Sequence, residues 1–407
     1  FCVPCVLLRL SPISPLMNWT PETRLLWTVR LTGIGFIGGI VLSWSLWTNR
    51  REYPLFPVWD GIPIFSPDVS ALITLFLLVV LGWIVVKPGR WNVLVFLVLM
   101  LFLALQDQSR WQPWAYQYVL MLLPLVFVYS RKDEKGTFGV LQFIMVMVYL
   151  WGGIHKCQPG WLSVWESSLV APLVEGRDGT FLATVLLSFG YVIPPIEIAM
   201  ALGLFFKRTR HLAVILILLT HVSILLLLGP VKGHISNSVV WPWNLVMMAM
   251  VVLLFYKQEG AFFTAFKNRS LLVPATGIAV LMTIAPIFFY AGLWDRYLSF
   301  SLYAGQQKRY LVQIPAPALP HIPEEWSEYL LDPKAKDGHM LLSPSSWSSK
   351  ELNVPLISEW RIIRRFSKEL CAYDLGGSQV RFYVDHRHLP NKEKRIYTCD
   401  QIDEMGN

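Results

Sequence analysis

Long apolar runs recur along this chain and limit the folds that it can adopt. A membrane helix needs about 20 mostly apolar residues to cross the hydrocarbon core. Runs of roughly that length lie at residues 25–47, 69–86, 91–106, 115–129, 137–154, 181–206, 211–229, 239–256 and 271–293. Because 54% of the 407 residues are hydrophobic and only 15% are charged, the chain is too apolar for a soluble globular protein. We expect an all-α polytopic membrane bundle of about nine transmembrane helices over residues 20–294.

Local signals mark the start of the first span. Thr20 is a helix-capping residue and Pro21 suits the first helical position, so a helix is expected to begin there. Gly35 and Gly39 are spaced for close contact with a neighbouring helix. Residues 1–19 are expected to form a disordered N-terminal leader.

The last part of the chain, residues 295–407, is more polar and is expected to form a soluble tail. Residues 309–314 and 379–384 have the β-rich alternation of strands. Between them, residues 355–370 place apolar side chains at helical spacing. The tail is therefore expected to have an α+β or β-rich fold.

The five cysteines fall into three groups. Cys2 and Cys5 have the C-x-x-C spacing of a redox or metal motif, but no second pair accompanies them, so their role stays open. Cys157 lies at the end of an apolar run. Cys371 and Cys399 both lie in the tail, where an oxidising outer side would permit a disulfide between them.

Charge distribution predicts the topology. The net charge of +8 could suggest a nucleic-acid partner, but the basic excess lies in the membrane part, where it reports orientation instead. With the N-terminus in the cytoplasm, the inner segments hold more than twice as many Lys and Arg residues as the outer loops. An odd number of spans then places the tail outside. We expect an integral protein of a bacterial inner membrane, surrounded by lipid bilayer, with no nucleic-acid partner.

A charged pair ends one of the apolar runs. The run that begins near residue 137 closes with His155 and Lys156, followed by a Pro-Gly break and Trp161. Lys and Trp flank most membrane spans, so Lys156 can be an ordinary interfacial anchor. It can also be a base that partial burial favours in its neutral form.

A second polar place is the turn from Gln106 to Tyr116. Asp107 and Arg110 can pair at its surface, for about 0–1 kcal/mol, or orient a substrate carboxylate. Tryptophans are common here and at other span ends, where an interfacial belt explains them, although they could also border a flat hydrophobic cofactor. These tryptophans include Trp111, Trp114, Trp161, Trp165, Trp241 and Trp243.

Two further places lie inside apolar runs or next to them. Glu197 is a carboxylate within a spanning run, where function or internal pairing is the usual explanation. His221 can be an interhelical hydrogen-bonding residue or part of a site that continues into His234 and Asn237. The proposed topology sends all these candidates to one side of the membrane. The histidines that follow Asp385 lack further ligands, so no metal site is expected there.

The stretch from Val148 to Trp161 resembles the signature of the vitamin K-dependent γ-carboxylase family and its bacterial relatives, the HTTM-domain proteins. In that family a lysine of the signature is regarded as the base that deprotonates a reduced quinone, and the matching residue is Lys156. The turn at residues 105–116 is similar to a second family motif, in which Asp107, Trp111 and Tyr116 match. Gln108, Gln112, Pro113 and Trp114 depart from that motif. Thr220-His221 and Trp241-Pro-Trp243 are similar to two later family segments.

The resemblance implies a quinone-linked oxidoreductase or carboxylase relative with a quinone or hydroquinone cofactor. It implies Lys156 as base, His155 or His221 as groups that polarise the quinone oxygen, and Glu197 or Asp107 as groups that orient the lysine or relay its proton. A peptide carboxylase would also need the tail to grip its substrate. The candidate substrate- or quinone-binding residues are Asp107, Arg110, Trp111, Trp114, Tyr116, His234 and Asn237.

Two other functions fit the same sequence. The chain could be a non-catalytic subunit or scaffold whose Trp-rich surface packs against other membrane subunits. It could also be a thiol-redox or transport protein of the DoxX-like kind, which would give Cys157 a role.

Overall fold

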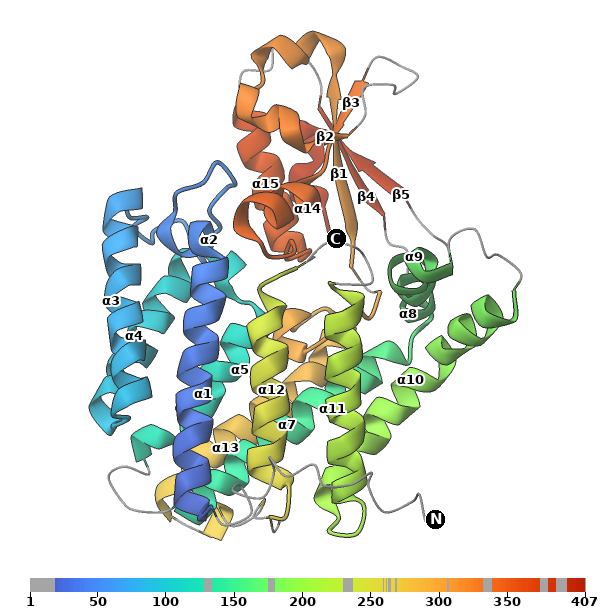
Figure 1. Cartoon of the computed structure of the whole chain (residues 1–407). Helices are drawn as coiled ribbons and strands as arrows, with labels where there is room; N and C mark the ends of the chain where they lie inside the picture. The colour runs from blue at the N-terminus through green and yellow to red at the C-terminus, as the bar shows by residue number, and fades with distance from the viewer. Residues whose placement is uncertain are drawn as a thin grey trace, which may run out of the picture.

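The computed structural model is a helical bundle with a small sheet at one end (Figure 1). It describes residues 19–127, 134–174, 180–229, 237–258, 260, 262, 265–267, 269–305, 307–331, 339–373, 380–385 and 394–406. Several residues discussed above therefore lie outside the described part, namely the leader up to residue 18 with Cys2 and Cys5, His234, and the histidines after Asp385.

Every apolar run expected from the sequence forms a helix. The helices are α1 (Pro21–Leu42), α2 (Trp44–Thr48), α3 (Pro67–Val86), α4 (Arg90–Gln106), α5 (Pro113–Leu122), α7 (Glu134–Lys156), α8 (Pro159–Val164), α9 (Ala171–Val174), α10 (Phe181–Phe205), α11 (Arg210–Leu227), α12 (Val240–Phe255) and α13 (Arg269–Thr283), which continues into the 3-10 helix η6 (Ala285–Ala291). Between α8 and α9 lies η3 (Trp165–Val170).

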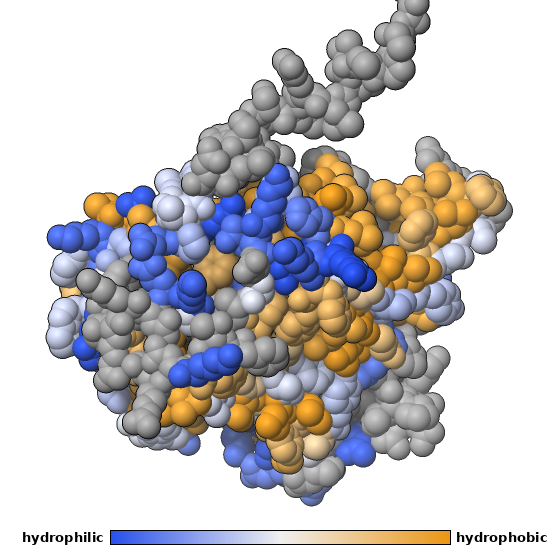
Figure 2. Space-filling model, turned by 90° about the horizontal axis from the view of Figure 1, so that it is seen from below, coloured by the Kyte–Doolittle hydropathy of each residue, from blue (hydrophilic) through white to orange (hydrophobic). Residues whose placement is uncertain are grey.

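Among the described residues, six helical segments are long and apolar enough to cross a membrane. They comprise α1, α3, α7, α10, α11 and the segment Leu271–Ala291. The apolar helices Arg90–Gln106, Pro113–Phe127 and Val240–Phe255 are shorter. Figure 2 shows the end opposite the sheet, where hydrophilic side chains gather beside a broad hydrophobic surface. Six candidate spans are thus established by length and composition, and the count of nine stays a prediction.

The first span starts as its sequence predicts but does not run unbroken. The Thr20 side chain accepts a hydrogen bond from the backbone N–H of Thr23, and Pro21 opens the helix. The expected run to residue 47 is interrupted at Ser43, whose hydroxyl donates to the carbonyl of Gly39 at 2.6 Å. The backbone N–H of Ser43 donates to the same carbonyl at 3.1 Å, and α1 ends at this residue before the short α2 follows.

Close approach of α1 to α5 depends on the two glycines singled out above. A Cβ atom at Gly39 would lie 2.5 Å from the Trp114 ring, and one at Gly35 would collide with the Tyr118 hydroxyl. Phe36 lies between them and packs edge-on against Trp114, with ring centroids 5.3 Å apart. The prediction of a close helix contact at these glycines is confirmed.

Two buried arginines cap helix ends at the end of the bundle opposite the sheet. Arg24 donates to the carbonyl of Leu253 at 3.1 Å, near the end of α12. Arg210 donates to the carbonyl of Leu204 at 2.8 Å, near the end of α10. The last carbonyls of a helix have no intrahelical donor and carry partial negative charge. These guanidinium groups therefore satisfy bonds that the helices cannot make themselves.

The C-terminal part forms one antiparallel sheet in the order β2-β3-β1-β4-β5. The elements are β1 (Arg309–Pro315), β2 (Leu330–Leu331), β3 (His339–Leu342), α14 (Pro344–Trp347), η10 (Ser348–Leu352), α15 (Trp360–Ala372), β4 (Arg381–Asp385), β5 (Lys394–Tyr397) and η11 (Cys399–Glu404). The two predicted strands are confirmed. The predicted helix begins at Trp360, five residues later than its apolar spacing suggested.

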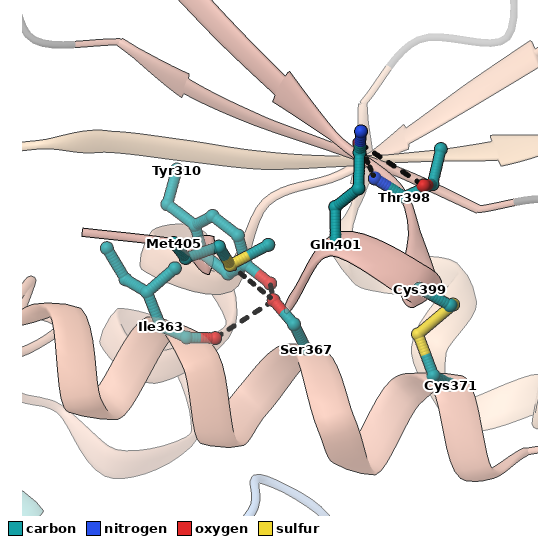
Figure 3. Close-up of a disulfide and its surroundings, with 8 residues drawn as sticks. All are labelled: Tyr310, Ile363, Ser367, Cys371, Thr398, Cys399, Gln401 and Met405. Carbon is teal, nitrogen blue, oxygen red and sulfur yellow. Dashed lines mark hydrogen bonds between the residues drawn. A yellow bond between two sulfur atoms is a disulfide. The ribbon is translucent and has the colours of Figure 1, made fainter. Parts of the chain in front are cut away.

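A disulfide links two elements of this C-terminal part, α15 and η11. Cys371 near the end of α15 is bonded to Cys399 at the start of η11, with 5.9 Å between their Cα atoms. Figure 3 shows the bond beside the contact of Ser367 with Tyr310 of β1, whose hydroxyls are 2.8 Å apart. The disulfide expected from the sequence forms.

The C-terminal part docks directly on the loops of the bundle. The Glu351 carboxylate accepts a hydrogen bond from the backbone N–H of Tyr53 at 2.8 Å. Asn353 donates to the Ser238 hydroxyl at 2.7 Å, and Arg361 donates to the side chain of Gln108. The loops that contact it come from three different helix connections, so they gather at one end of the bundle beneath the sheet (Figure 1).

Candidate functional site

The site is created where α7 crosses α10. A Cβ atom at Gly153 would lie 2.8 Å from the side chain and 2.9 Å from the backbone nitrogen of Ile198. Only a glycine lets the two backbones approach this closely. The crossing brings the end of α7 to the middle of α10, and Lys156 Nζ lies 2.6 Å from Glu197 Oε2.

The Lys156–Glu197 ion pair is largely withdrawn from solvent. Each side chain is 13% exposed. The ammonium group also donates to the carbonyl of Gly152 at 3.3 Å and lies 5.6 Å from the centre of the Trp161 ring, within reach of a cation–π interaction. Lys156 is thus held by a specific acid, an environment unlike that of a lysine that snorkels freely to the interface.

Beside this pair lies a cavity of about 470 Å³ between α10 and α11. Lys156 and Glu197 are the charged groups among the described residues that line it. The apolar wall includes Leu186, Phe189, Ile193, Ile196, Leu216, Leu219, Ile224 and Leu227. Phe189 and Leu219 are 49% and 57% exposed, so the cavity adjoins the apolar outer surface of these two helices.

Trp161 and Trp165 form the aromatic side of the cavity, and both contact Gly190 of α10. Pro194 lies inside α10 and has no N–H, so the carbonyl of Gly190, one turn earlier, loses its helical donor. The Trp161 indole donates to that carbonyl at 2.7 Å. Trp165 fills the space left by the missing side chain of Gly190, 2.5 Å from the Cβ atom that another residue would have there. The sequence left two interpretations of these tryptophans open, an interfacial belt and the border of a flat cofactor, and did not indicate their contacts with Gly190.

His155 is fully buried and is not among the described residues that line this cavity. Its Nε2 lies 3.0 Å from the carbonyl of Ser299, and its Nδ1 lies 3.0 Å from the Tyr290 hydroxyl. Trp151 stacks on the ring at 5.4 Å. The neighbour of Lys156 in sequence therefore ties α7 to the segment after α13, on the other side of the helix.

His221 also has both ring nitrogens engaged. Nδ1 lies 2.6 Å from Asn244 Oδ1, and Nε2 lies 2.9 Å from the Tyr149 hydroxyl. These contacts join α11, α12 and α7. The structure thus gives His221 the interhelical hydrogen bonds that were one of its two interpretations.

Asp107 and Arg110 are buried rather than exposed, and each has a different partner. Asp107 pairs with Arg51 at 2.7 Å, and both side chains are at most 1% exposed. Arg110 donates to the Leu46 carbonyl at 3.0 Å and to Asn49 Oδ1 at 2.7 Å, and burial lowers its pKa to about 10. The surface pair considered above is replaced by two buried contacts that brace the loops.

The other residues of the second motif are spread around this loop. Trp111 donates to the Ala104 carbonyl at 2.8 Å, and Trp114 packs against α1 as described. The Tyr116 ring lies 5.6 Å from Phe300, and its hydroxyl has no partner among the described residues. None of these three lines the cavity at Lys156 among the described residues. Asn237 donates to the hydroxyl of Tyr303 at 2.9 Å, and Tyr303 does line that cavity.

Cys157 is the free cysteine of the described part of the chain. Burial, and secondly the nearby charge of Glu197, raise the pKa of its thiol. Its thiolate fraction is therefore lower than that of an ordinary cysteine, while the side chain itself is exposed.

No cluster of three His, Cys, Asp or Glu side chains suited to a metal ion is found among the described residues. Comparisons of the chain with protein-family models, with curated proteins and with solved structures find no match.

Proposed function

We propose that this chain is an integral membrane protein that takes a lipophilic quinol from the bilayer into the cavity between α10 and α11 and removes a proton from its hydroxyl group. The observation that carries the proposal is the Lys156–Glu197 pair, with 2.6 Å between its atoms, in the wall of an otherwise apolar cavity. Intramembrane charges are costly, so a pair kept beside a cavity indicates chemistry there. The resemblance of the surrounding motif to γ-carboxylases and HTTM proteins supplies the ligand class.

The residues of the cavity suit such a ligand. A volume of about 470 Å³ lies in the range of small-molecule pockets. Trp161 and Trp165, with ring centroids 5.6 Å apart, offer flat surfaces for a quinol ring. The exposed apolar residues of α10 and α11 offer a path for an isoprenoid chain toward lipid. A bound quinol would supply reducing electrons for its oxygenation, which the resembled γ-carboxylase family couples to removal of a substrate proton.

The pair can move a proton without charging the cavity further. Transfer of a proton from Lys156 Nζ to Glu197 Oε2 leaves a neutral amine and a neutral acid. A ligand that excludes water favours this neutral state, because isolated charges are costly in an apolar surrounding. Nζ then accepts the hydroxyl proton and becomes an ammonium group facing the new oxyanion. Glu197 thus serves as the relay, while His155 and His221 position helices.

We extend the proposal to topology. Nine membrane spans, a cytoplasmic N-terminus and an outer tail in a bacterial inner membrane are supported by three features. The basic residues counted above lie mostly in the segments assigned to the inner side. Tyr53, Gln108 and Ser238, from three segments assigned to the outer side, contact the C-terminal part at the other end. The disulfide fits an oxidising compartment.

Turnover of the Lys156→Ala variant tests the proposed chemistry. The protein is reconstituted in lipid nanodiscs, and oxygen uptake with a short-chain quinol is measured beside quenching of tryptophan fluorescence by the oxidised quinone. Loss of the base is expected to lower kcat by about a hundredfold or more, while quinone affinity changes only a few-fold. Glu197→Gln is expected to lower kcat as well. Lys207→Ala, which removes an exposed lysine at a helix end, is the matched control and should leave both readouts unchanged.

Other outcomes favour the alternatives. Unchanged turnover in Lys156→Ala would contradict the proposal. A wild-type protein that shows no turnover and co-purifies with other membrane subunits would favour a non-catalytic subunit. Loss of activity in Cys157→Ser, with Lys156→Ala still active, would favour the thiol-redox interpretation.

A further inference from the structure

A second and larger cavity, of about 640 Å³, lies between the bundle and the C-terminal part. Its walls come from the first residues of α5 and α12, from α8 and η3, from the segment 302–311 and from α14 with the chain after it. In Figure 1 the sheet stands over the ends of these helices. The cavity is thus built by elements far apart in the sequence.

Its charged lining is of one sign. Among the described lining residues, Arg296, Lys308 and Arg309 are basic and none is acidic. Lys308 donates to the Ser358 carbonyl at 3.2 Å. Burial lowers the pKa of both Arg296 and Lys308. Glu359, which accepts a hydrogen bond from the backbone N–H of Arg296 at 3.0 Å, offsets part of this charge. The remaining positive charge favours an anion in this cavity.

Two residues that line the cavity each carry a buried donor with no acceptor among the described residues. Arg296 is 6% exposed, and while its Nε donates to the Ser301 carbonyl at 3.0 Å, its Nη1 has no partner among the described residues. Trp114 is 2% exposed, and its indole N–H likewise has no partner there. Buried donors are rarely left unpaired, since each costs about 1–3 kcal/mol. Both donors could therefore be satisfied by oxygen atoms of a ligand.

Part of the remaining lining is apolar and fits the body of an organic molecule, while serine, asparagine and glutamine side chains line the rest. Trp243, Leu302, Leu311 and Leu356 are apolar, and Ser345 lies at the exposed edge. The first turns of α5 and α12 also border the cavity, and their partial positive charge adds to that of the basic side chains.

We infer that this cavity binds an organic oxyanion, a carboxylate or phosphate carried on an apolar body, with Arg296 Nη1 and the Trp114 indole as donors to its oxygen atoms. Tyr303 lines both this cavity and the one at Lys156, so the two cavities are neighbours. The oxyanion site stands on its own donors and does not depend on the proposed quinol chemistry.

Calorimetric titration of the full chain in nanodiscs of neutral phosphatidylcholine tests the site, with phenyl phosphate and phenylacetate as probes. The wild type is expected to bind at least one probe with one-to-one stoichiometry, and Arg296→Gln is expected to lose the binding. Because Arg296 also braces its own segment, a second variant is needed. Ser345→Glu adds a negative charge at the exposed edge and should weaken binding at least tenfold, whereas Ser349→Glu, on an exposed residue that does not line the cavity, should not.

The source of the oxyanion is settled by repeating the titration in nanodiscs that contain phosphatidylglycerol. Weaker probe binding in the wild type would show that a lipid headgroup competes for the same donors. Unchanged binding would show a water-soluble ligand. The inference is overturned if the wild type binds neither probe in neutral lipid, or if Ser345→Glu and Ser349→Glu bind them equally well.

Discussion

Asp107 and Arg51 form a buried ion pair in the loops of the bundle, so removal of either residue alone leaves the other charge buried without a partner. Their side chains are 0% and 1% exposed, and Arg51 Nε and Nη1 have no other partner among the described residues. The Asp107 carboxylate also accepts from the backbone N–H of Ser109 at 3.0 Å. These contacts indicate that Asp107 fixes the loop that the C-terminal part contacts.

Asp107→Ala is therefore expected to destabilise the protein by about 3–5 kcal/mol, because it leaves a buried guanidinium unpaired. Thermal unfolding in detergent, followed by loss of tryptophan fluorescence, measures the effect. The matched control is Asp68→Ala, which removes the exposed pair of Asp68 with Arg50, where the side chains are 86% and 59% exposed. That change should cost only about 0–1 kcal/mol. Equal losses in the two variants would refute a special role for the buried pair.

Single residues could be singled out from the sequence, but their partners could not. Lys156 and Glu197 stand out because charge is rare in apolar runs. Their pairing depends on the crossing of two helices, which no local pattern specifies. Asp107 and Arg110 suggested a pair by proximity in sequence, yet the partner of Asp107 lies 56 residues away.

At the scale of elements, the crossing of α7 and α10 carries the site. Gly153 lets the backbones meet, and Pro194 with Gly190 shapes α10 to receive two tryptophans. Gly153 of the signature thus has a packing reason that is independent of the chemistry of the lysine.

Gly153→Ala tests that reason. The added methyl group would press on Ile198 from 2.8 Å, so α10 must shift and the Lys156–Glu197 pair must lengthen. We expect lower thermal stability together with weaker quinone quenching of the tryptophans. Gly82→Ala in α3, where nothing lies within 4 Å of the new Cβ atom, should be neutral or stabilising by up to about 1 kcal/mol. Unaltered quenching in Gly153→Ala would show that the close crossing does not position the site.

Hydrophobic runs predicted the helices well, because a long apolar segment in lipid must satisfy its backbone hydrogen bonds internally, as a helix does. Finer features came from side chains. The first helix breaks at Ser43, where both the hydroxyl and the backbone N–H donate to the Gly39 carbonyl. Arg24 and Arg210, which the sequence suggested only as markers of the inner side, also satisfy helix carbonyls. Periodicity reports neither effect.

At the scale of the whole molecule, the C-terminal part and the bundle share one core. The hydrophobic cluster includes Tyr53 and Phe56 of the first loop together with Trp347 and Phe366 of the C-terminal part. The topology predicted from charge already placed the polar loops on one side. The way that the C-terminal part covers them could not be predicted, because the contacts join residues up to 311 positions apart.

Removal of the disulfide by Cys371→Ser with Cys399→Ser should loosen this cover selectively. The bond closes a loop with a separation of 28 residues, for which chain entropy gives about 3–4 kcal/mol. Hydrogen exchange is expected to rise in α15 and η11, while quinone quenching at the cavity between α10 and α11 stays unchanged. Faster exchange throughout the bundle would instead mean that the two parts unfold as one unit.

Photolabelling tests the central claim most directly. A quinone that carries a photoreactive group is added to the protein in nanodiscs, irradiated and located by peptide mass spectrometry. Labels are expected on α10 between Leu186 and Met200 and on α11 between Leu216 and Leu228, the walls of the cavity at Lys156, and excess unlabelled quinone should suppress them. Labels scattered over all lipid-facing helices, or unaffected by the competitor, would contradict a quinol site at the Lys156–Glu197 pair.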